Sequence, residues 1–324
     1  MEKILVSGSS GFIGNNLSRK LIQLERNGYG TVRDISKFNS SANFKYYSLD
    51  NIGPKTNWQN ILNKVSCIIH CAGIAHEIKR INDLHLYQSV NLDGTKNFAN
   101  QAAKAGVKRF IFLSSTKVNE ESDLKIFDNK IDENQKKGKL NLRDSQNSSN
   151  LYAKSKLAAE KALWKISAET GLEVVILRLP LVYGKGAKGN LLRLIKLIKN
   201  NIPLPFKSIK NQRSFLGIDN LIDILIHCVD HPNAAGKTFM VSDDDDLSTI
   251  DLIKHIASAM NKKVRLFSFP ITILKILSSM IGKRNEIDSL TGSLQIDITN
   301  TKKILKWEPP LSVKEGIKKM VQNK

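Results

Sequence analysis

The 324-residue sequence predicts an α/β fold with a doubly wound parallel sheet and a smaller, mixed α/β lobe. Short β-branched runs alternate with amphipathic stretches through the first 180 residues, which implies right-handed crossovers between parallel strands. A glycine-rich turn joins the first apolar run to the first amphipathic stretch. The chain is also long enough to form two lobes around a large core.

The predicted elements of the first half alternate in type. Strands are predicted at residues 4–6, 31–35, 44–47, 67–70, 110–113 and 174–177, of which 31–35 is short and polar. Helices are predicted at 12–25, 84–105 and 151–170 because they have amphipathic patterns. Residues 119–150 are polar and charged and lack apolar periodicity, which predicts a long loop, mobile or acting as a lid.

Beyond Leu181 the order is less regular, and prolines such as Pro203 and Pro205 interrupt it. Helices are predicted at 190–200, 219–229 and 249–260. We assign residues 1–180 and about 212–245 to the large sheet domain, and about 181–211 with 246–324 to the smaller lobe. The apolar run at 267–281 is interpreted as a packed amphipathic helix, and a membrane-surface helix is the less favoured alternative.

Composition and charge restrict the possible partners. The net charge of +20 and pI near 9.8 favour an anionic partner, but the Lys and Arg residues are spread along the chain. A phosphate-bearing small molecule therefore fits better than nucleic acid.

Three scattered cysteines fit a reducing cytoplasm, and no apolar run reaches the roughly 18 residues that span a bilayer. The histidines lack ligand spacing, so no metal site is expected.

The glycine-rich turn indicates a dinucleotide site. Gly8, Gly11 and Gly14 follow the first strand and open the first helix. Gly8 permits the tight turn, Gly11 lets the backbone approach a pyrophosphate, and Gly14 allows close packing of helix and strand. The helix N-terminus then faces the anion. The sheet domain is therefore expected to bind the dinucleotide, and the smaller lobe to bind the substrate.

The second and third strands bear on the form of the dinucleotide. A carboxylate after the second strand binds the free ribose hydroxyls, whereas an arginine accommodates a 2′-phosphate. Arg33 and Asp34 stand side by side there, so the sequence does not decide between NAD and NADP. Asp50 follows the third strand, where it could bind the adenine amino group or simply belong to a turn.

A tyrosine and a lysine in the predicted helix at 151–170 indicate proton transfer. Tyr152 and Lys156 are four residues apart and share one helical face. An ammonium beside a phenol favours the phenolate and lowers the phenol's pKa, which would let Tyr152 give and take a proton near neutral pH. Hydride transfer at an alcohol or ketone carbon requires such a group.

Several motifs follow one another along nearly the whole chain. They are the glycine turn, His70-Cys-Ala-Gly73, Asn91-Leu-Asp-Gly-Thr95, Ser114-Ser115, Tyr152-x-x-x-Lys156, Arg178-Leu-Pro-Leu-Val-Tyr-Gly184 and Arg213-Ser-Phe-Leu-Gly-Ile-Asp219. In this combination the sequence resembles the extended short-chain dehydrogenase/reductases. That family contains sugar-nucleotide epimerases and dehydratases, and the resemblance implies a Rossmann-like fold and a homodimer paired through the helices at 84–105 and 151–170.

The resemblance also implies roles for individual residues. Ser115 would hydrogen-bond the substrate oxygen, Tyr152 would exchange the proton, and Lys156 would bind the nicotinamide ribose. The expected contacts of the NAD(P)H cofactor are Gly8, Gly11, Phe12, Ile13, Gly14, Arg33, Asp34, Asp50, Ala72, Tyr152 and Lys156. The expected contacts of a UDP-sugar substrate are Ser115, Thr116, Lys188, Asn190 and Arg213, the last because a guanidinium suits a diphosphate.

The residues after Ser115 bear on the reaction. Similar 4,6-dehydratases carry an acidic pair there, whereas this chain has Thr116 and Lys117. The run from Lys117 to Glu120 resembles reductases that act on UDP-4-keto-6-deoxy-N-acetylhexosamine in surface polysaccharide pathways. An NAD(P)H-dependent 4-ketoreductase is therefore the first expectation. A 4-epimerase of a UDP-hexose or UDP-N-acetylhexosamine is the alternative.

Overall fold

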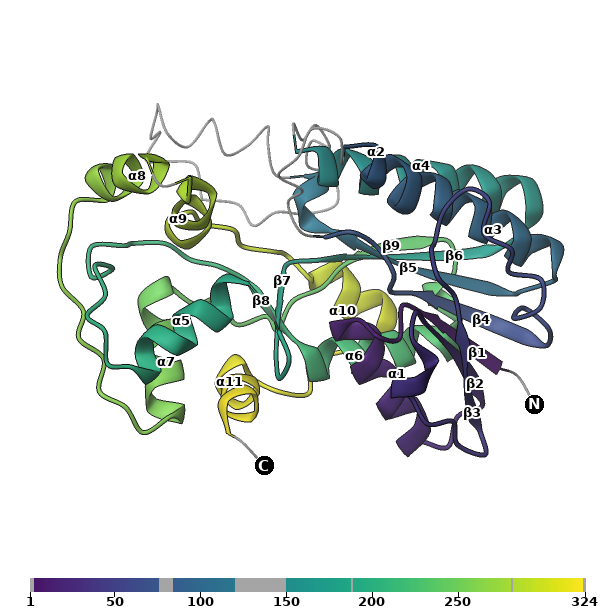
Figure 1. Ribbon diagram of the computed structural model, residues 1–324, viewed down its shortest axis with the longest axis horizontal. Helices are drawn as coiled ribbons and strands as arrows, with labels where there is room; N and C mark the ends of the chain where they lie inside the picture. Colours follow the sequence, from purple (N-terminus) through teal and green to yellow (C-terminus); the bar gives the residue numbers. More distant parts are fainter. Residues whose placement is uncertain (1–2, 76–83, 120–149, 188, 281, 323–324) are drawn as a thin grey trace.

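A seven-stranded parallel sheet forms the centre of the computed structural model, which describes residues 3–75, 84–119, 150–187, 189–280 and 282–322 (Figure 1). The strand order is β3-β2-β1-β4-β5-β6-β9. The strands are β1 (Lys3–Ser7), β2 (Gly28–Val32), β3 (Phe44–Ser48), β4 (Val65–His70), β5 (Arg109–Ser115), β6 (Glu173–Leu179) and β9 (Lys237–Met240). This arrangement confirms the predicted fold class. Most of the predicted loop at 119–150 lies outside the described residues.

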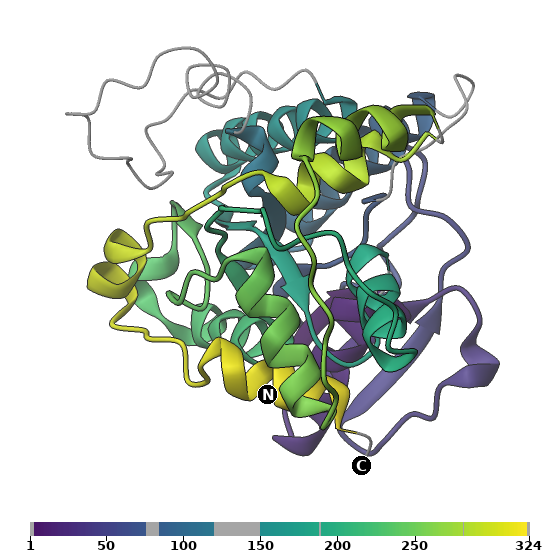
Figure 2. The same ribbon diagram turned by 90° about the vertical axis from the view of Figure 1, so that its left-hand side faces the viewer.

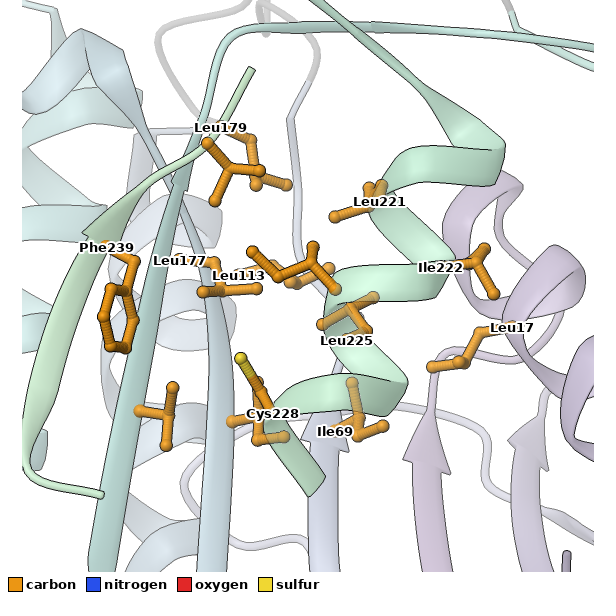
Figure 3. Close-up of a cluster of buried hydrophobic side chains, with 14 of the residues drawn as sticks. Leu17, Ile69, Leu113, Leu177, Leu179, Leu221, Ile222, Leu225, Cys228 and Phe239 are labelled. Carbon is orange, nitrogen blue, oxygen red and sulfur yellow. The ribbon is translucent and has the colours of Figure 1, made fainter. Parts of the chain in front are cut away.

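Helices cover both faces of this sheet (Figure 1). One face carries α1 (Phe12–Gln23), α6 (Ile218–Asp230) and α10 (Thr299–Leu305), and the other carries α3 (Thr95–Lys104) and α4 (Leu151–Thr170). Figure 3 shows the first face, where Leu221, Leu225 and Cys228 of α6 pack toward Leu113 and Leu177 of the sheet. The strand order turns back between β1 and β4, so the carboxyl ends of these strands form the crevice in which such sheets bind ligands.

The second strand is found at Gly28–Val32, earlier than the predicted 31–35. Its glycines explain the error, because glycine is uncommon inside strands. A Cβ atom on Gly28 would lie 2.5 Å from the carbonyl oxygen of Ile4, and one on Gly30 would lie 2.8 Å from the ring of Tyr46. The neighbouring strands therefore fill the space that side chains would need.

The helix predicted at 84–105 is divided into three parts. A short α2 (Leu84–Leu86) leads into a π-helical segment, η3 (Tyr87–Gly94), and then into α3. Within η3, the Asn91 amide accepts a hydrogen bond from the Ile74 nitrogen at 2.8 Å and donates to the Ser155 hydroxyl at 3.1 Å. The wider turn thus directs Asn91 between the end of β4 and helix α4. Such π-helical segments occur frequently at functional sites.

The smaller lobe is built from short elements around its own apolar cluster. A two-stranded parallel sheet of β7 (Leu181–Tyr183) and β8 (Phe215–Gly217) lies next to the large sheet. The helices of this lobe are α5 (Asn190–Lys199), α7 (Thr249–Ala259), α8 (Ile271–Met280), α9 (Arg284–Thr291) and α11 (Val313–Val321). In the part of the chain that the structure describes, none of the helices combines the length and the hydropathy needed to cross a bilayer.

A buried carboxylate joins the two lobes. Asp243, just after β9, accepts hydrogen bonds from the Tyr183 hydroxyl at 2.8 Å and from the Asn220 amide at 2.7 Å. Asn220 also donates to the carbonyl oxygen of Leu311 at 2.8 Å. Burial raises the pKa of Asp243, while its hydrogen-bond donors partly oppose that shift.

Candidate functional site

The glycine turn after β1 is tightly packed against the segment that follows β4. Gly8 has φ of +73°, and a Cβ atom on it would lie 2.9 Å from the Cα of Ala72. A Cβ atom on Gly14 would lie 2.3 Å from the carbonyl oxygen of Gly8. Gly11 caps α1 without a side-chain hydrogen bond, so the cap itself places no side chain over the helix N-terminus. The turn therefore fits a dinucleotide pyrophosphate, with the Phe12 and Ile13 backbones in the first turn of the helix.

A buried histidine holds this turn, a role that was not predicted from the sequence. His70 Nδ1 lies 2.6 Å from the Ser7 hydroxyl, and His70 Nε2 lies 3.0 Å from the Thr95 hydroxyl. Burial, with a smaller effect of Lys156, lowers the pKa of His70 to about 3, so its ring is neutral near pH 7. Two features of the sequence could have indicated this role: His70 ends an apolar run, and it opens the motif His70-Cys-Ala-Gly73.

The ends of β2 and β3 bring the expected ribose and adenine contacts to one edge. The carboxylate of Asp34 forms an ion pair with Lys37 at 2.7 Å and accepts from the Ser36 hydroxyl at 2.6 Å. These contacts lower the pKa of Asp34 to about 2. The Ser48 hydroxyl donates to the Arg33 carbonyl at 3.3 Å, and exposed Asp50 follows β3. Asp34 is therefore an exposed, ionised group where a ribose is expected.

Helix α4 carries the tyrosine and the lysine. Asn150 caps the helix, accepting hydrogen bonds from the backbone nitrogens of Tyr152 at 2.9 Å and Ala153 at 3.3 Å. Tyr152 is half-buried in the first turn, with its ring centroid 6.2 Å from that of Tyr87. The N-terminal cap thus fixes the helix start directly beside the predicted acid/base residue.

The ammonium of Lys156 is buried at the end of β5. It donates to the carbonyl oxygen of Leu113 at 2.9 Å and lies 4.4 Å from the centroid of the Phe112 ring. It also borders Gly73, where a Cβ atom would come within 3.3 Å of the lysine nitrogen. Burial lowers the pKa of Lys156 to about 8, although Glu160 and Cys71 oppose that shift.

The end of β5 brings the expected serine to the same place. Ser115 is buried two residues beyond Leu113, and its hydroxyl accepts a hydrogen bond from the Lys117 nitrogen at 3.2 Å. Thr116 is also buried, and its hydroxyl donates to the Leu179 carbonyl at 3.3 Å. In this structure Thr116 links β5 to β6, while Ser115 begins the turn that follows.

A buried ion pair that was not predicted from the sequence lies behind these residues. The guanidinium of Arg178 binds both carboxylate oxygens of Glu160, at 2.6 and 3.1 Å, and also the Asn119 amide oxygen at 3.1 Å. The Ser114 hydroxyl donates to Glu160 as well. The pair therefore connects α4, β5, β6 and the turn after Ser115. The feature of the sequence that could have indicated this ion pair is Arg178, a charged residue within the apolar run of β6.

The smaller lobe contributes one segment beside the glycine turn, and its other expected contacts lie at the start of α5 and beside α9. A Cβ atom on Gly184 would lie 3.5 Å from the ring of Phe12, so the segment after β7 borders α1. Asn190 is exposed at the start of α5. The guanidinium of Arg213 donates to the Gly292 carbonyl at 3.0 Å, next to α9. Lys188 lies outside the described residues.

Comparison with known proteins agrees with this arrangement. Residues 4–242 match the NAD dependent epimerase/dehydratase family. A UDP-glucose 4-epimerase of Vibrio cholerae is 37% identical, and the alignment covers 99% of this chain and 95% of that protein.

Two solved structures from Bacillus cereus share the fold. The UDP-glucuronic acid 4-epimerase in complex with NAD has a TM-score of 0.75 and 19% identity, covering 98% of this chain and 96% of that chain. The UDP-N-acetylglucosamine 4-epimerase has a TM-score of 0.75 and 17% identity, covering 99% and 98%. The family match spans most of the large sheet, including the glycine turn and the α4 pair. The chain belongs to the NAD dependent epimerase/dehydratase family, and it is an NAD-dependent enzyme that modifies nucleotide sugars.

Proposed function

We propose that this chain is an NAD-dependent 4-epimerase of a UDP-hexose or UDP-N-acetylhexosamine. The observation that carries the proposal is the 37% identity to the Vibrio cholerae UDP-glucose 4-epimerase over 99% of the chain. The capped α4 helix, which positions Tyr152 and the buried Lys156, supports it. The epimerase replaces the 4-ketoreductase as the first interpretation because the named relatives described above are 4-epimerases.

In this proposal Tyr152 of α4 transfers the proton, and Lys156 of α4 and Ser115 of β5 assist it. Tyr152 takes the proton of the sugar's C4 hydroxyl and returns a proton to that oxygen after the sugar has presented its other face. Lys156 favours the phenolate through its charge and binds the nicotinamide ribose, while Ser115 donates to the C4 oxygen. Bound NAD supplies oxidation and re-reduction of that carbon.

Binding is assigned to the edges of the same crevice. The glycine turn at Gly8, Gly11 and Gly14 would hold the pyrophosphate, and Asp34 would accept hydrogen bonds from the adenosine ribose. Its ionised carboxylate would repel a 2′-phosphate, which supports NAD over NADP. Arg213 and the segment before Asn190 would face the diphosphate of the sugar nucleotide.

A 4-ketoreductase remains the second candidate because of one segment. The residues after Ser115 form the short turn η4 (Thr116–Val118), and Asn119 then binds Arg178. The run from Lys117 to Glu120 resembles that of the 4-ketoreductases, which is the feature that favours this candidate. A reductase would use the same Tyr152 and Lys156 once per catalytic cycle and then release the oxidised cofactor.

The test is an incubation of the purified protein with NAD and UDP-glucose or UDP-N-acetylglucosamine. An epimerase interconverts each sugar with its C4 epimer and leaves the amount of NAD unchanged. Tyr152→Phe should lower the rate by about 10²–10⁴-fold and keep NAD binding, whereas Tyr87→Phe on the neighbouring ring is the matched control. Absence of interconversion, with stoichiometric oxidation of NADH or NADPH by a 4-keto sugar nucleotide, would establish the reductase instead.

A further inference from the structure

Helix α8 (Ile271–Met280) has apolar side chains on two opposite faces. Its inner residues Ile271 and Leu274 pack against the apolar cluster of the smaller lobe. Its outer residues are exposed to solvent by 46% at Ile273, 57% at Ile276, 50% at Leu277 and 79% at Met280. The expectation of a packed amphipathic helix is therefore right for only one face.

The four outer residues form a continuous stripe. Their spacing of three, four and seven residues from Ile273 places them on the same side of the helix. Phe267, which precedes the helix, is also 45% exposed. Both views place α8 at the outside of the smaller lobe (Figures 1 and 2). A grouped apolar surface of this kind is typical of an interaction site.

The sequence around this stripe is strongly cationic. Between Asp251 and Glu286 it contains Lys and Arg residues but no Asp or Glu; the cations are Lys254, Lys262, Lys263, Arg265, Lys275, Lys283 and Arg284. Lys283 and Arg284 lie three and four residues after the last residue of α8, at the start of α9, and are exposed. Lys275 and Arg284 each pair with Asp288, at 3.2 and 3.6 Å. Lys275, Lys283 and Arg284 lie on or shortly after α8, and Asp288 is the carboxylate that pairs with two of them, so the charge beside the stripe is positive and favours an anionic partner.

We propose that α8 docks the protein onto an anionic phospholipid bilayer. The stripe Ile273, Ile276, Leu277 and Met280 would insert at the boundary of headgroups and acyl chains. Lys283 and Arg284 would contact the lipid phosphates. This docking is independent of the reaction assigned to the enzyme, since none of these residues belongs to the glycine turn, α4 or β5.

A bilayer fits this surface better than a second copy of the chain does. Two copies that paired with their α8 helices parallel would bring Lys283 and Arg284 of both copies together, and like charges oppose that association. The stripe is also a convex ridge on a single helix, which a fluid bilayer accepts without a complementary groove.

The experiment measures co-sedimentation of the full-length protein with vesicles. Binding is expected to vesicles of phosphatidylcholine with phosphatidylglycerol, and about tenfold less to phosphatidylcholine alone. The double variant Ile276→Glu with Leu277→Glu should bind the anionic vesicles at least about tenfold more weakly. The matched control, Leu24→Glu with Ile202→Glu, adds the same charge at exposed apolar residues away from α8 and should bind as wild type.

A second measurement protects the test against a misfolded variant. Ile276→Trp should shift its fluorescence to shorter wavelength when anionic vesicles are added, whereas Leu24→Trp should not. Wild-type protein that stays in solution with anionic vesicles would overturn the proposal. Equal binding of the two glutamate variants to anionic vesicles would also overturn it. A further contrary result would be light scattering without lipid in which the wild type is an oligomer and the stripe variant dissociates while vesicle binding is unchanged.

Discussion

Two buried cations differ in their partners, Lys156 in the expected reaction centre and Arg178 behind it. Arg178 is matched by a carboxylate, since its guanidinium binds both oxygens of Glu160. Lys156 lies one turn before Glu160 on α4, but its nearest partners are the Leu113 carbonyl and the Phe112 ring. Within the described part of the chain, no carboxylate forms an ion pair with this ammonium.

The different partners of Arg178 and Lys156 indicate different roles: Arg178 stabilises the fold, whereas Lys156 takes part in the chemistry. Arg178 and Glu160 neutralise each other, so their contribution is to hold α4, β5, β6 and the turn after Ser115 in place. Lys156 is buried without that compensation, and its pKa is lowered to about 8 as a result. Perturbed ionisable groups of this kind cluster at functional sites because chemistry, rather than stability, requires them.

The largest expected effect is the loss of activity in Lys156→Met. Removing the charge beside the proposed phenolate should lower kcat/KM by about 10²–10⁴-fold. The free energy of unfolding should change by less than about 1 kcal/mol, because the hydrogen bond to Leu113 is lost while a buried charge is removed. Turnover assays and urea denaturation test both parts.

The control for that variant is Lys161→Met, which removes an exposed charge from the same helix. Its activity and its stability should both match those of the wild type. A Lys156→Met protein that kept its activity would show that the lysine has no part in the proton chemistry. One that unfolded as easily as a Glu160 variant would show that Lys156 is a structural charge.

The next effect is on stability, and it comes from breaking the matched pair. Glu160→Ala leaves the guanidinium of Arg178 buried without its carboxylate and should cost about 3–5 kcal/mol in the free energy of unfolding. The double variant Glu160→Ala with Arg178→Met should recover part of that loss. Equal losses in the single and double variants would contradict the assignment of Arg178 and Glu160 as a coupled pair.

A smaller effect is expected in the pH dependence of stability. The lowered pKa of Lys156, about 8 against 10.5, means that the unfolded chain binds a proton between these pH values that the folded chain lacks. The free energy of unfolding should therefore rise with pH in that window, by at most about 1.4 kcal/mol per pH unit from this group. Subtracting the Lys156→Met curve isolates the contribution, and a flat difference would refute the lowered pKa.

The smallest effect on the free energy of unfolding is expected at a surface ion pair whose geometry is similar to that of Arg178 and Glu160. Arg26 binds both oxygens of Asp230, at 2.9 and 3.0 Å, but these side chains are 37% and 60% exposed. Arg26→Ala should cost about 0.5 kcal/mol, and the loss should shrink further in high salt. A cost near that of Glu160→Ala would mean that burial does not determine the strength of these pairs.

Much of the fold followed from local patterns in the sequence, because alternating apolar runs and amphipathic stretches leave few possible topologies. The glycine turn and the Tyr152–Lys156 spacing were likewise local. The β2 register was not predictable, since Gly28 and Gly30 are explained only by the side chains of neighbouring strands. The pairing of Arg178 with Glu160 and the exposed face of α8 also depend on tertiary packing, which periodicity does not describe.

The order of the elements along the chain has a consequence for biosynthesis. Helix α6 and strand β9 complete the large sheet, yet they are translated after β7, α5 and β8 of the other lobe. A nascent chain that ends at residue 180 still exposes Leu113 and Leu177, which α6 later covers (Figure 3). The large sheet domain therefore cannot complete its sheet until about three quarters of the polypeptide has emerged, and α10, which also covers this face, follows later still. The domain cannot be produced alone by a simple C-terminal truncation.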